Sequence, residues 1–271
     1  MKYEDYLVLI DVCKDYVNAF NALYRLHTYD DVEIEKIYRE IKKVFIDSEL
    51  YEPIQILEII SDAAIYNNGY FKSYWMIFKK IFEGIDHSQI YTISNLFDYF
   101  VYKEYGILFN EKKCKLFKWY DSLKLSTNVH KYGSIYKAIM DDDKEFFIAY
   151  TRNPSFNKNQ KLQSEFYPNS EDGYTLLELC CYHGAIGCFN FLLSEFKADI
   201  TYQCLCLSFL GGNPGIISEC LKYRDPGEQC MEYAIISHNI DFISFLMNEK
   251  RLQLNLNCCM KHYNLQSFLL H

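Results

Sequence analysis

The sequence predicts an all-α protein in which an N-terminal helical domain precedes a solenoid of helix pairs. Half of the 271 residues are hydrophobic, which supplies enough apolar surface for a packed core. Only 11 Gly and 5 Pro interrupt the chain, too few for the turns of a many-stranded sheet. In the second half, a helix, a tight polar turn and a second helix recur. We therefore expect an aromatic-rich helical domain over residues 1–130 and repeats over residues 131–271.

Apolar residues recur three and four apart up to about Ser126, which predicts five or six helices. The first helix carries a stripe from Leu7 to Tyr24, and the second covers residues 32–45. Pro53 opens the third, because proline suits a first helical turn.

The remaining helices of this domain are bounded by glycine and serine. The fourth covers residues 70–82, between Gly69 and Gly84. The fifth follows Ser88, a predicted N-cap, and ends at Gly106, whose lack of a side chain suits the left-handed end of a helix. A shorter, lysine-rich sixth helix covers residues 111–119.

The repeats are recognised by two adjacent residues that follow each tight turn. Intervals of 42, 28, 26 and 25 residues separate these pairs. The long first interval contains proline-bearing polar stretches at 153–155 and 167–172, which indicate an inserted loop. The five pairs are Phe146-Phe147, Cys188-Phe189, Ile216-Ile217, Phe242-Ile243 and Ser267-Phe268.

The second unit, residues 172–200, resembles an ankyrin repeat along its whole length. The matching residues are Asp172-Gly173 and Thr175 at the turn and helix start, Leu177, the small pair Cys180-Cys181, Gly184 in the inter-helix turn, and the closing pair Leu192-Leu193. Leu176 and Glu178 replace the usual proline and histidine, which puts the Thr/His hydrogen bonding of that repeat in doubt here.

The turn between the two helices needs a residue that tolerates positive φ, and Gly184, Gly212 and His238 align there. The later units fall short of the ~33 residues of an ankyrin repeat, so we expect helix pairs without its projecting turn.

Longer strings of the chain are similar to the N-terminal region of the large trichomonad ankyrin-repeat family. They cover residues 101–106, 135–140 and 230–242, in addition to the unit above. In that family this region is a domain of unknown function, commonly followed by a longer array of regular repeats. The resemblance implies a short family member or the N-terminal part of a longer protein. It also implies the activity that ankyrin arrays usually have, which is binding other proteins.

Stacked helix pairs bind through the face formed by their first helices, which predicts a non-enzymatic protein-interaction scaffold with an unidentified protein partner. An alternative is a cap for a longer array, with an apolar edge near Leu265, Phe268, Leu269 and Leu270 that allows self-association. The candidate partner-binding residues are Tyr174, Glu178, Tyr182, His183, Tyr202 and Gln203.

Charge and cysteine content narrow the classes of function. The formal charge of -8, without a basic stripe, opposes a nucleic-acid partner. No apolar stretch approaches the ~20 residues of a transmembrane helix, and no export signal precedes the first acidic residues. Eleven cysteines, an odd number, then predict reduced thiols and a cytoplasmic location.

A thiol or zinc-dependent enzyme is a second alternative, because Cys180-Cys181 lie close to His183 and Cys258-Cys259 close to His262. No Cys-x2-Cys pair occurs, and small buried thiols suit helix packing. The glycine-rich segment 210–215 follows a helix and lacks the Lys-Ser/Thr of a phosphate loop. We therefore expect no enzyme, cofactor or metal site.

Two lysine-rich aromatic segments leave a further alternative open. The helix over residues 70–82 carries aromatic residues at helical spacing beside three lysines. A second patch places Lys112, Lys113, Lys115 and Lys118 around Leu116, Phe117 and Trp119. Such stripes are typical of core helices with a solvated face, although a membrane-surface or partner helix has the same pattern.

Overall fold

The computed structural model describes residues 3–87 and 93–270, and the chain is all-α as predicted. It divides into two compact units. The helical unit comprises residues 18–129 and 165–168, and the repeat unit comprises residues 1–17, 130–164 and 169–271. The division predicted at residue 130 differs from this one in two segments: residues 1–17 group with the repeat unit, and residues 165–168 group with the helical unit.

The helices of the helical unit follow the predicted order, except at the start of the chain. The predicted first helix is broken at Cys13, so that α1 (Tyr3–Val12) precedes α2. The predicted N-cap Ser88 lies outside the described residues; α6 ends at Gly106 with φ 70°, as expected. The α-helices described in this unit are α2 (Lys14–Tyr24), α3 (Asp31–Ile41), α4 (Pro53–Tyr66), α5 (Phe71–Phe82), α6 (Asn95–Tyr105) and α7 (Cys114–Leu123).

Aromatic side chains fill the core of the helical unit. The Phe71 ring lies 5.0 Å from that of Phe97 and 4.9 Å from that of Phe166. Asn68 Nδ2 donates to the Phe166 carbonyl oxygen at 2.7 Å, which fixes residues 165–168 in this core. Every aromatic side chain of the α5 stripe is buried, so α5 is a core helix.

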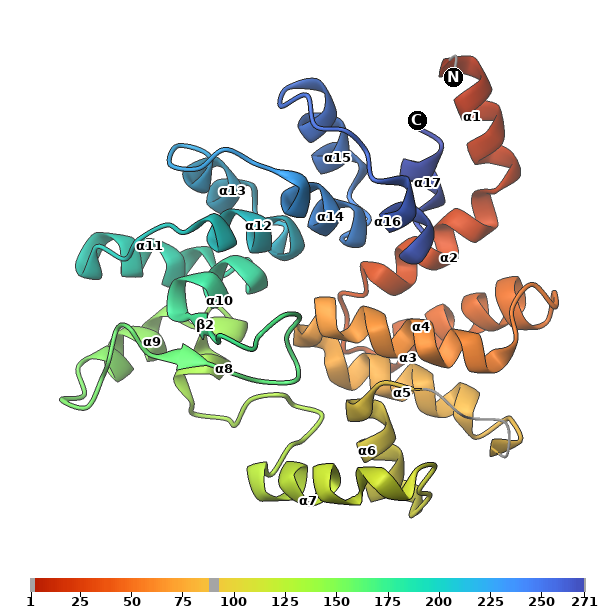
Figure 1. Ribbon diagram of the computed structural model, residues 1–271, viewed down its shortest axis with the longest axis horizontal. Helices are drawn as coiled ribbons and strands as arrows, with labels where there is room; N and C mark the ends of the chain where they lie inside the picture. Colours follow the sequence, from red (N-terminus) through yellow and green to blue (C-terminus); the bar gives the residue numbers. More distant parts are fainter. Residues whose placement is uncertain (1–2, 88–92, 271) are drawn as a thin grey trace. The chain divides into compact units, whose positions relative to one another are not determined.

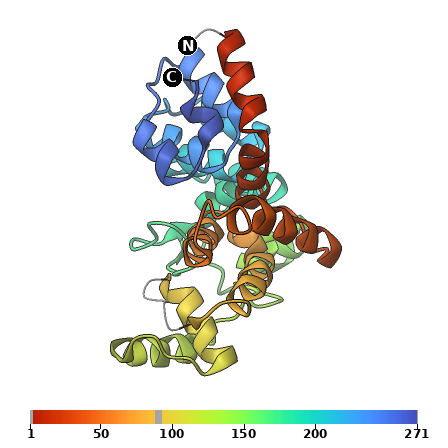
Figure 2. The same ribbon diagram turned by 90° about the vertical axis from the view of Figure 1, so that its right-hand side faces the viewer.

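The repeat unit contains five consecutive helix pairs (Figure 1). The first helix of each pair packs against the first helix of the next, and we call these the inner helices. Figure 2 shows α1 beside the C-terminal helices of this unit. The pairs are α8 (Ile135–Met140) with α9 (Lys144–Thr151), α10 (Leu176–His183) with α11 (Ile186–Phe196), α12 (Tyr202–Gly211) with α13 (Pro214–Cys220), α14 (Glu228–Ile236) with α15 (Ile240–Asn248), and α16 (Leu256–Lys261) with α17 (Leu265–Phe268).

The predicted insertion lies between the first two pairs. Within it, β1 (Lys161–Leu162) and β2 (Tyr174–Thr175) pair antiparallel, with Leu162 opposite Tyr174. Thr175 is also the N-cap of α10, so the short sheet sets the position at which the second pair begins.

Each pair turns through one residue with positive φ, and the N-cap of the second helix follows directly. The prediction of such a turn at Gly184, Gly212 and His238 is confirmed. Asp142 and Tyr263 occupy the same position in the first and last pairs, with φ 50° and 55°. All five turns therefore share one backbone geometry, although only two of them contain glycine.

The turns also connect successive pairs. Asn213 Oδ1 accepts from the backbone at the start of α13, while Asn213 Nδ2 donates to the Gly184 carbonyl oxygen at 3.2 Å. Asn264 repeats this arrangement: it caps α17 and donates to the Ile235 carbonyl oxygen at 2.8 Å. One asparagine thus caps the start of a helix and holds the preceding pair.

The second and third pairs approach most closely at Gly211. A Cβ atom there would lie 2.1 Å from the Cys181 carbonyl oxygen and 2.6 Å from the Gly184 nitrogen. Because both are backbone atoms, we expect Gly211→Ala to lower the free energy of unfolding by about 3 kcal/mol or more. Urea denaturation would measure this loss.

Gly212→Ala is the matched control, because a Cβ atom at Gly212 meets nothing within 4 Å. Its cost comes from φ 69° alone, about 1–2 kcal/mol. Equal losses for the two variants would contradict the close approach at Gly211.

Candidate protein-interaction surface

The six predicted contact residues lie on β2 and on the inner helices α10 and α12. Tyr174, Glu178 and Tyr182 are buried. His183 and Gln203 are half-buried, and Tyr202 is 39% exposed. Tyr202 therefore offers the most accessible side chain of the set, and the role of all six as contact residues stays a prediction.

Glu178 connects the N-termini of α10 and α12. Its Oε2 accepts from the Thr175 backbone nitrogen at 2.8 Å, which completes a capping box with the Thr175 hydroxyl. Its Oε1 accepts from the Thr201 hydroxyl at 2.8 Å, and Thr201 in turn caps α12. The carboxylate thus supplies the hydrogen bonding between repeats that the loss of the usual histidine had put in doubt.

Two of the predicted residues meet at a third that the sequence did not single out. Gln203 hydrogen-bonds with both Tyr174 and Tyr233, a residue of α14. Asn169 Nδ2 also donates to the Tyr233 hydroxyl, at 3.4 Å. Successive elements β2, α12 and α14 therefore contribute one row of polar side chains. A tyrosine hydroxyl beside the apolar residues Ala234, Ile235 and Ile236 of α14 is the signal that could have identified Tyr233.

Tyr202 extends this row toward the start of α14. Its hydroxyl hydrogen-bonds with the thiols of Cys206 and Cys230, whose sulfur atoms lie 3.3 Å apart. Gly227 leaves room for the ring, because a Cβ atom there would lie 2.6 Å from the Tyr202 hydroxyl oxygen. The exposed ring is held in place at its hydroxyl end by the two thiols.

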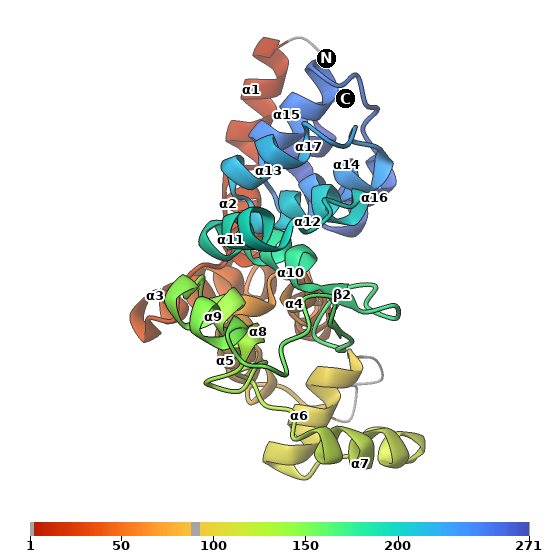
Figure 3. The ribbon, with the colours of Figure 1, turned by 90° about the vertical axis from the view of Figure 1, so that its left-hand side faces the viewer.

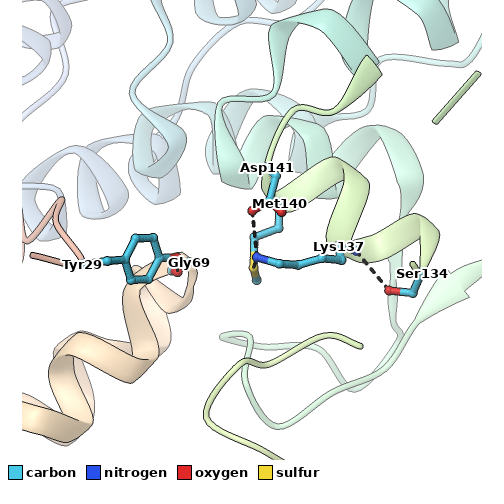
Figure 4. Close-up of polar contacts among 6 residues, drawn as sticks. All are labelled: Tyr29, Gly69, Ser134, Lys137, Met140 and Asp141. Carbon is cyan, nitrogen blue, oxygen red and sulfur yellow. Dashed lines mark hydrogen bonds and ion pairs between the residues drawn. The ribbon is translucent and has the colours of Figure 1, made fainter. Parts of the chain in front are cut away.

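The environment of His183 includes a second histidine and a lysine. Burial lowers the pKa of His183 well below its usual value, and the charges of His130 and Lys137 lower it further. Burial and Lys137 also lower the pKa of His130 to about 4. Lys137 Nζ donates to Asp141 Oδ1 at 2.7 Å and approaches Met140 Sδ (Figure 4). Both imidazoles are therefore neutral at pH 7.

The nine cysteines of the last third of the chain are all buried, as packing by small thiols requires. Burial raises the pKa of Cys180 and Cys181 well above the usual thiol value. A thiolate–imidazolium pair needs a low thiol pKa beside a protonated histidine. The raised thiol pKa values and the lowered pKa of His183 are the opposite of this combination.

Two further features concern metals and membranes. In residues 3–87 and 93–270, no group of three or more His, Cys, Asp or Glu side chains is arranged to hold a metal ion. No helix in those ranges has the length and apolar character needed to cross a bilayer. The segment 210–215 forms the end of α12, its turn and the start of α13, as predicted from its helical context.

Comparison with known proteins finds a match in one part of the chain. A family model described as a domain of unknown function, DUF3447, matches residues 196–271, from the last residue of α11 onward. No curated protein and no solved structure matches the chain.

Replacing Glu178 tests the connection between α10 and α12. We expect Glu178→Ala to lower the free energy of unfolding by about 2 kcal/mol, since a carboxylate with two hydrogen bonds is lost. Glu178→Gln keeps one acceptor oxygen and should lose about half as much. Chemical denaturation measures both. Glu195→Ala, on the exposed side of α11, is the control and should stay near the wild-type value; an equal loss there would remove the special role of Glu178.

Acid should destabilise the fold through its buried histidines. Burial lowers the pKa of His262, like that of His130, to about 4. Below the ordinary histidine pKa, the unfolded chain takes up protons that the folded chain does not. The stabilisation is therefore complete above about pH 6.5 and is lost toward pH 4, at up to ~1.4 kcal/mol per pH unit for each histidine.

Urea denaturation between about pH 7 and pH 5 measures this slope. His262→Gln should make it shallower, whereas replacement of the exposed His27 by Gln should not. A slope that His262→Gln leaves unchanged would exclude His262 as a source of the acid sensitivity.

Proposed function

We propose that this protein is a non-enzymatic protein-interaction scaffold of ankyrin-repeat type. The supporting observation is the row of polar side chains that β2, α12 and α14 contribute across successive repeats. Stacked helix pairs share one core along the array, so their inner helices can present residues from several repeats to one partner.

The row is suited to binding because it is ordered before a partner arrives. Tyr202 is anchored through its hydroxyl, and Gln203 hydrogen-bonds with Tyr174 and Tyr233. An aromatic side chain that is already fixed loses little conformational entropy when it is buried in an interface. Tyr202, with 39% of its surface exposed, is the proposed anchor.

The proposal includes the resemblance to the N-terminal region of the trichomonad ankyrin-repeat family. It also places the protein in the cytoplasm, where reduced thiols such as the nine buried cysteines persist. A thiol or zinc enzyme has less support, because burial opposes thiolate formation at Cys180 and Cys181.

A second candidate is a cap for a longer repeat array. It is favoured by the C-terminal pair, where Met260 is 57% exposed and α17 has four residues. Leu265, Phe268, Leu269 and Leu270 are half-buried along the same edge. An apolar edge of this kind suits the docking of a further repeat or of a second copy.

Affinity capture with the full chain as bait, followed by mass spectrometry, tests the scaffold. We expect the double variant Tyr202→Ser, Gln203→Ala to recover a specific partner about tenfold less well, because the anchor and its neighbour are lost. The thermal midpoint of each bait should be measured in parallel, so that loss of folding is distinguished from loss of contact.

The matched control is Asn190→Ala with Ser194→Ala, two exposed positions of α11. It should capture the partner as the wild type does. Full capture by the Tyr202/Gln203 variant would contradict the proposed surface, and loss of capture by the α11 variant alone would move the contact to α11.

A further inference from the structure

The outward face of α7 combines exposed apolar side chains with lysines. Phe117 and Tyr120 are buried toward α6, where the Tyr99 ring lies 5.7 Å and 5.3 Å from theirs. On the outward side, Trp119 is 47% exposed and Leu123 is 49% exposed. Figure 3 shows α7 lying across the end of α6 within the helical unit. Two large apolar groups one helical turn apart thus face solvent.

Four lysines without an ion-pair partner lie in the same segment as these groups. Within residues 3–87 and 93–270, no hydrogen bond or ion pair engages the side chains of Lys112, Lys115, Lys118 and Lys124, and all four are exposed. Of the two carboxylates in this segment, Asp121 pairs with Lys103 at 2.8 Å, and Glu111 remains as the opposing charge. The patch is therefore positive on a chain whose formal charge is -8.

Lys113 has a different part in this segment. Its Nζ lies 2.6 Å from Oδ2 of Asp98, a residue of α6 that is only 1% exposed. This ion pair joins the turn that leads into α7 to α6. Lys115 and Lys118 lie on α7 itself, Lys112 lies in the preceding turn and Lys124 is the C-cap. Spacings of three and four residues then place Lys112, Lys115, Trp119 and Leu123 along one side.

The aromatic stripe of α5 does not offer a comparable surface. Trp75 is 5% exposed, and its Nε1 donates to Glu104 at 3.1 Å. Lys79 pairs with Glu104 and Lys80 with Glu35, each at 2.8 Å. Two segments of similar composition therefore differ: α5 is a core helix in which two of the three lysines are paired, whereas α7 keeps Trp119, Leu123 and its lysine charges exposed.

We propose that α7 docks the protein on an anionic lipid bilayer. Trp119 lies at the level of the headgroups, Leu123 enters the apolar boundary, and the four lysines bind lipid phosphates and carboxylates. Charge complementarity is the basis of this choice, and the exposed Leu123 favours a bilayer over a nucleic acid, whose backbone offers no apolar phase. The proposed attachment is separate from the partner-binding row of the repeat unit.

Tryptophan fluorescence of the full chain tests the docking, because the chain has two tryptophans and Trp75 is buried. We expect phosphatidylcholine vesicles that contain phosphatidylserine to shift the Trp119 emission to shorter wavelength and to co-sediment the protein. Vesicles of phosphatidylcholine alone should do neither. Raised salt should weaken binding, since it screens the lysine charges.

Variants separate the contributions of charge and of apolar groups. Lys115→Gln with Lys118→Gln should lower the partition coefficient about twentyfold, and Trp119→Ala with Leu123→Ser about tenfold. Lys36→Gln with Lys43→Gln removes the same charge from exposed positions elsewhere in the helical unit and should leave binding unchanged. Circular dichroism and the thermal midpoint check that each variant is folded.

Absence of binding to anionic vesicles would overturn the proposal, as would equal binding to neutral ones. Binding that survives in the Trp119/Leu123 variant, or an equal loss in the Lys36/Lys43 control, would also overturn it. Binding of an anionic oligonucleotide or an acidic peptide, in place of vesicles, would assign the patch to that ligand.

Discussion

The repeat unit depends on one backbone constraint, a single residue with positive φ in the turn of every helix pair. Asp142, Gly184, Gly212, His238 and Tyr263 occupy this position, and an N-cap follows each of them. A left-handed residue costs about 1–2 kcal/mol when it carries a side chain, so three of the five turns store strain that neighbouring contacts must offset. His238 shows one such contact, because its Nε2 lies 2.9 Å from the His262 carbonyl oxygen of the next pair. The turn that shapes one pair is thus stabilised by another.

The same interdependence appears at the turn of the second pair, where Ala185 occupies the N-cap of α11 but has no side chain that can accept a hydrogen bond. Asp142, the turn residue of the preceding pair, accepts from the Gly187 and Cys188 nitrogens at 2.9 Å each. Gly187 leaves space for this carboxylate, since a Cβ atom there would lie 3.1 Å from Asp142 Oδ1. Capping therefore passes from one repeat to the next, as it does at the inner helices through Glu178 and Thr201. Such bonds couple the pairs, and a coupled array unfolds more cooperatively than independent helices would.

The fold was predictable from the sequence where the signal is local, and the candidate site only in part. The paired residues after each turn identified the second helix of all five pairs, because each pair of residues begins at the third residue of that helix. Glycine and histidine marked three of the turns. Tyr263 was missed because a bulky residue rarely adopts positive φ, and Asp142 because it stands in a run of three aspartates, in which residue type does not single out the turn position. Residues 165–168 were missed for another reason: they complete a core whose other members are distant in sequence. At the candidate surface, Tyr174 and Gln203 were among the predicted contact residues. Tyr233 was not, because its place depends on how α12 and α14 stack, which periodicity does not specify.

The two lysine-rich aromatic segments show what composition leaves undetermined. Both α5 and α7 carry aromatic residues at helical spacing beside lysines, and the sequence favoured packing for both. Their difference arises from their neighbours. α5 packs against α3 and α4, and its apolar stripe is buried together with Phe97, a residue of α6. On α7 the buried side chains are Phe117 and Tyr120, and no neighbouring element in residues 3–87 and 93–270 covers Trp119, which stays 47% exposed. The proposed binding at this surface therefore follows from the position of α7 as the last helix of the helical unit. The number of neighbouring helices, and not the sequence pattern, decides which of its side chains remain free to bind.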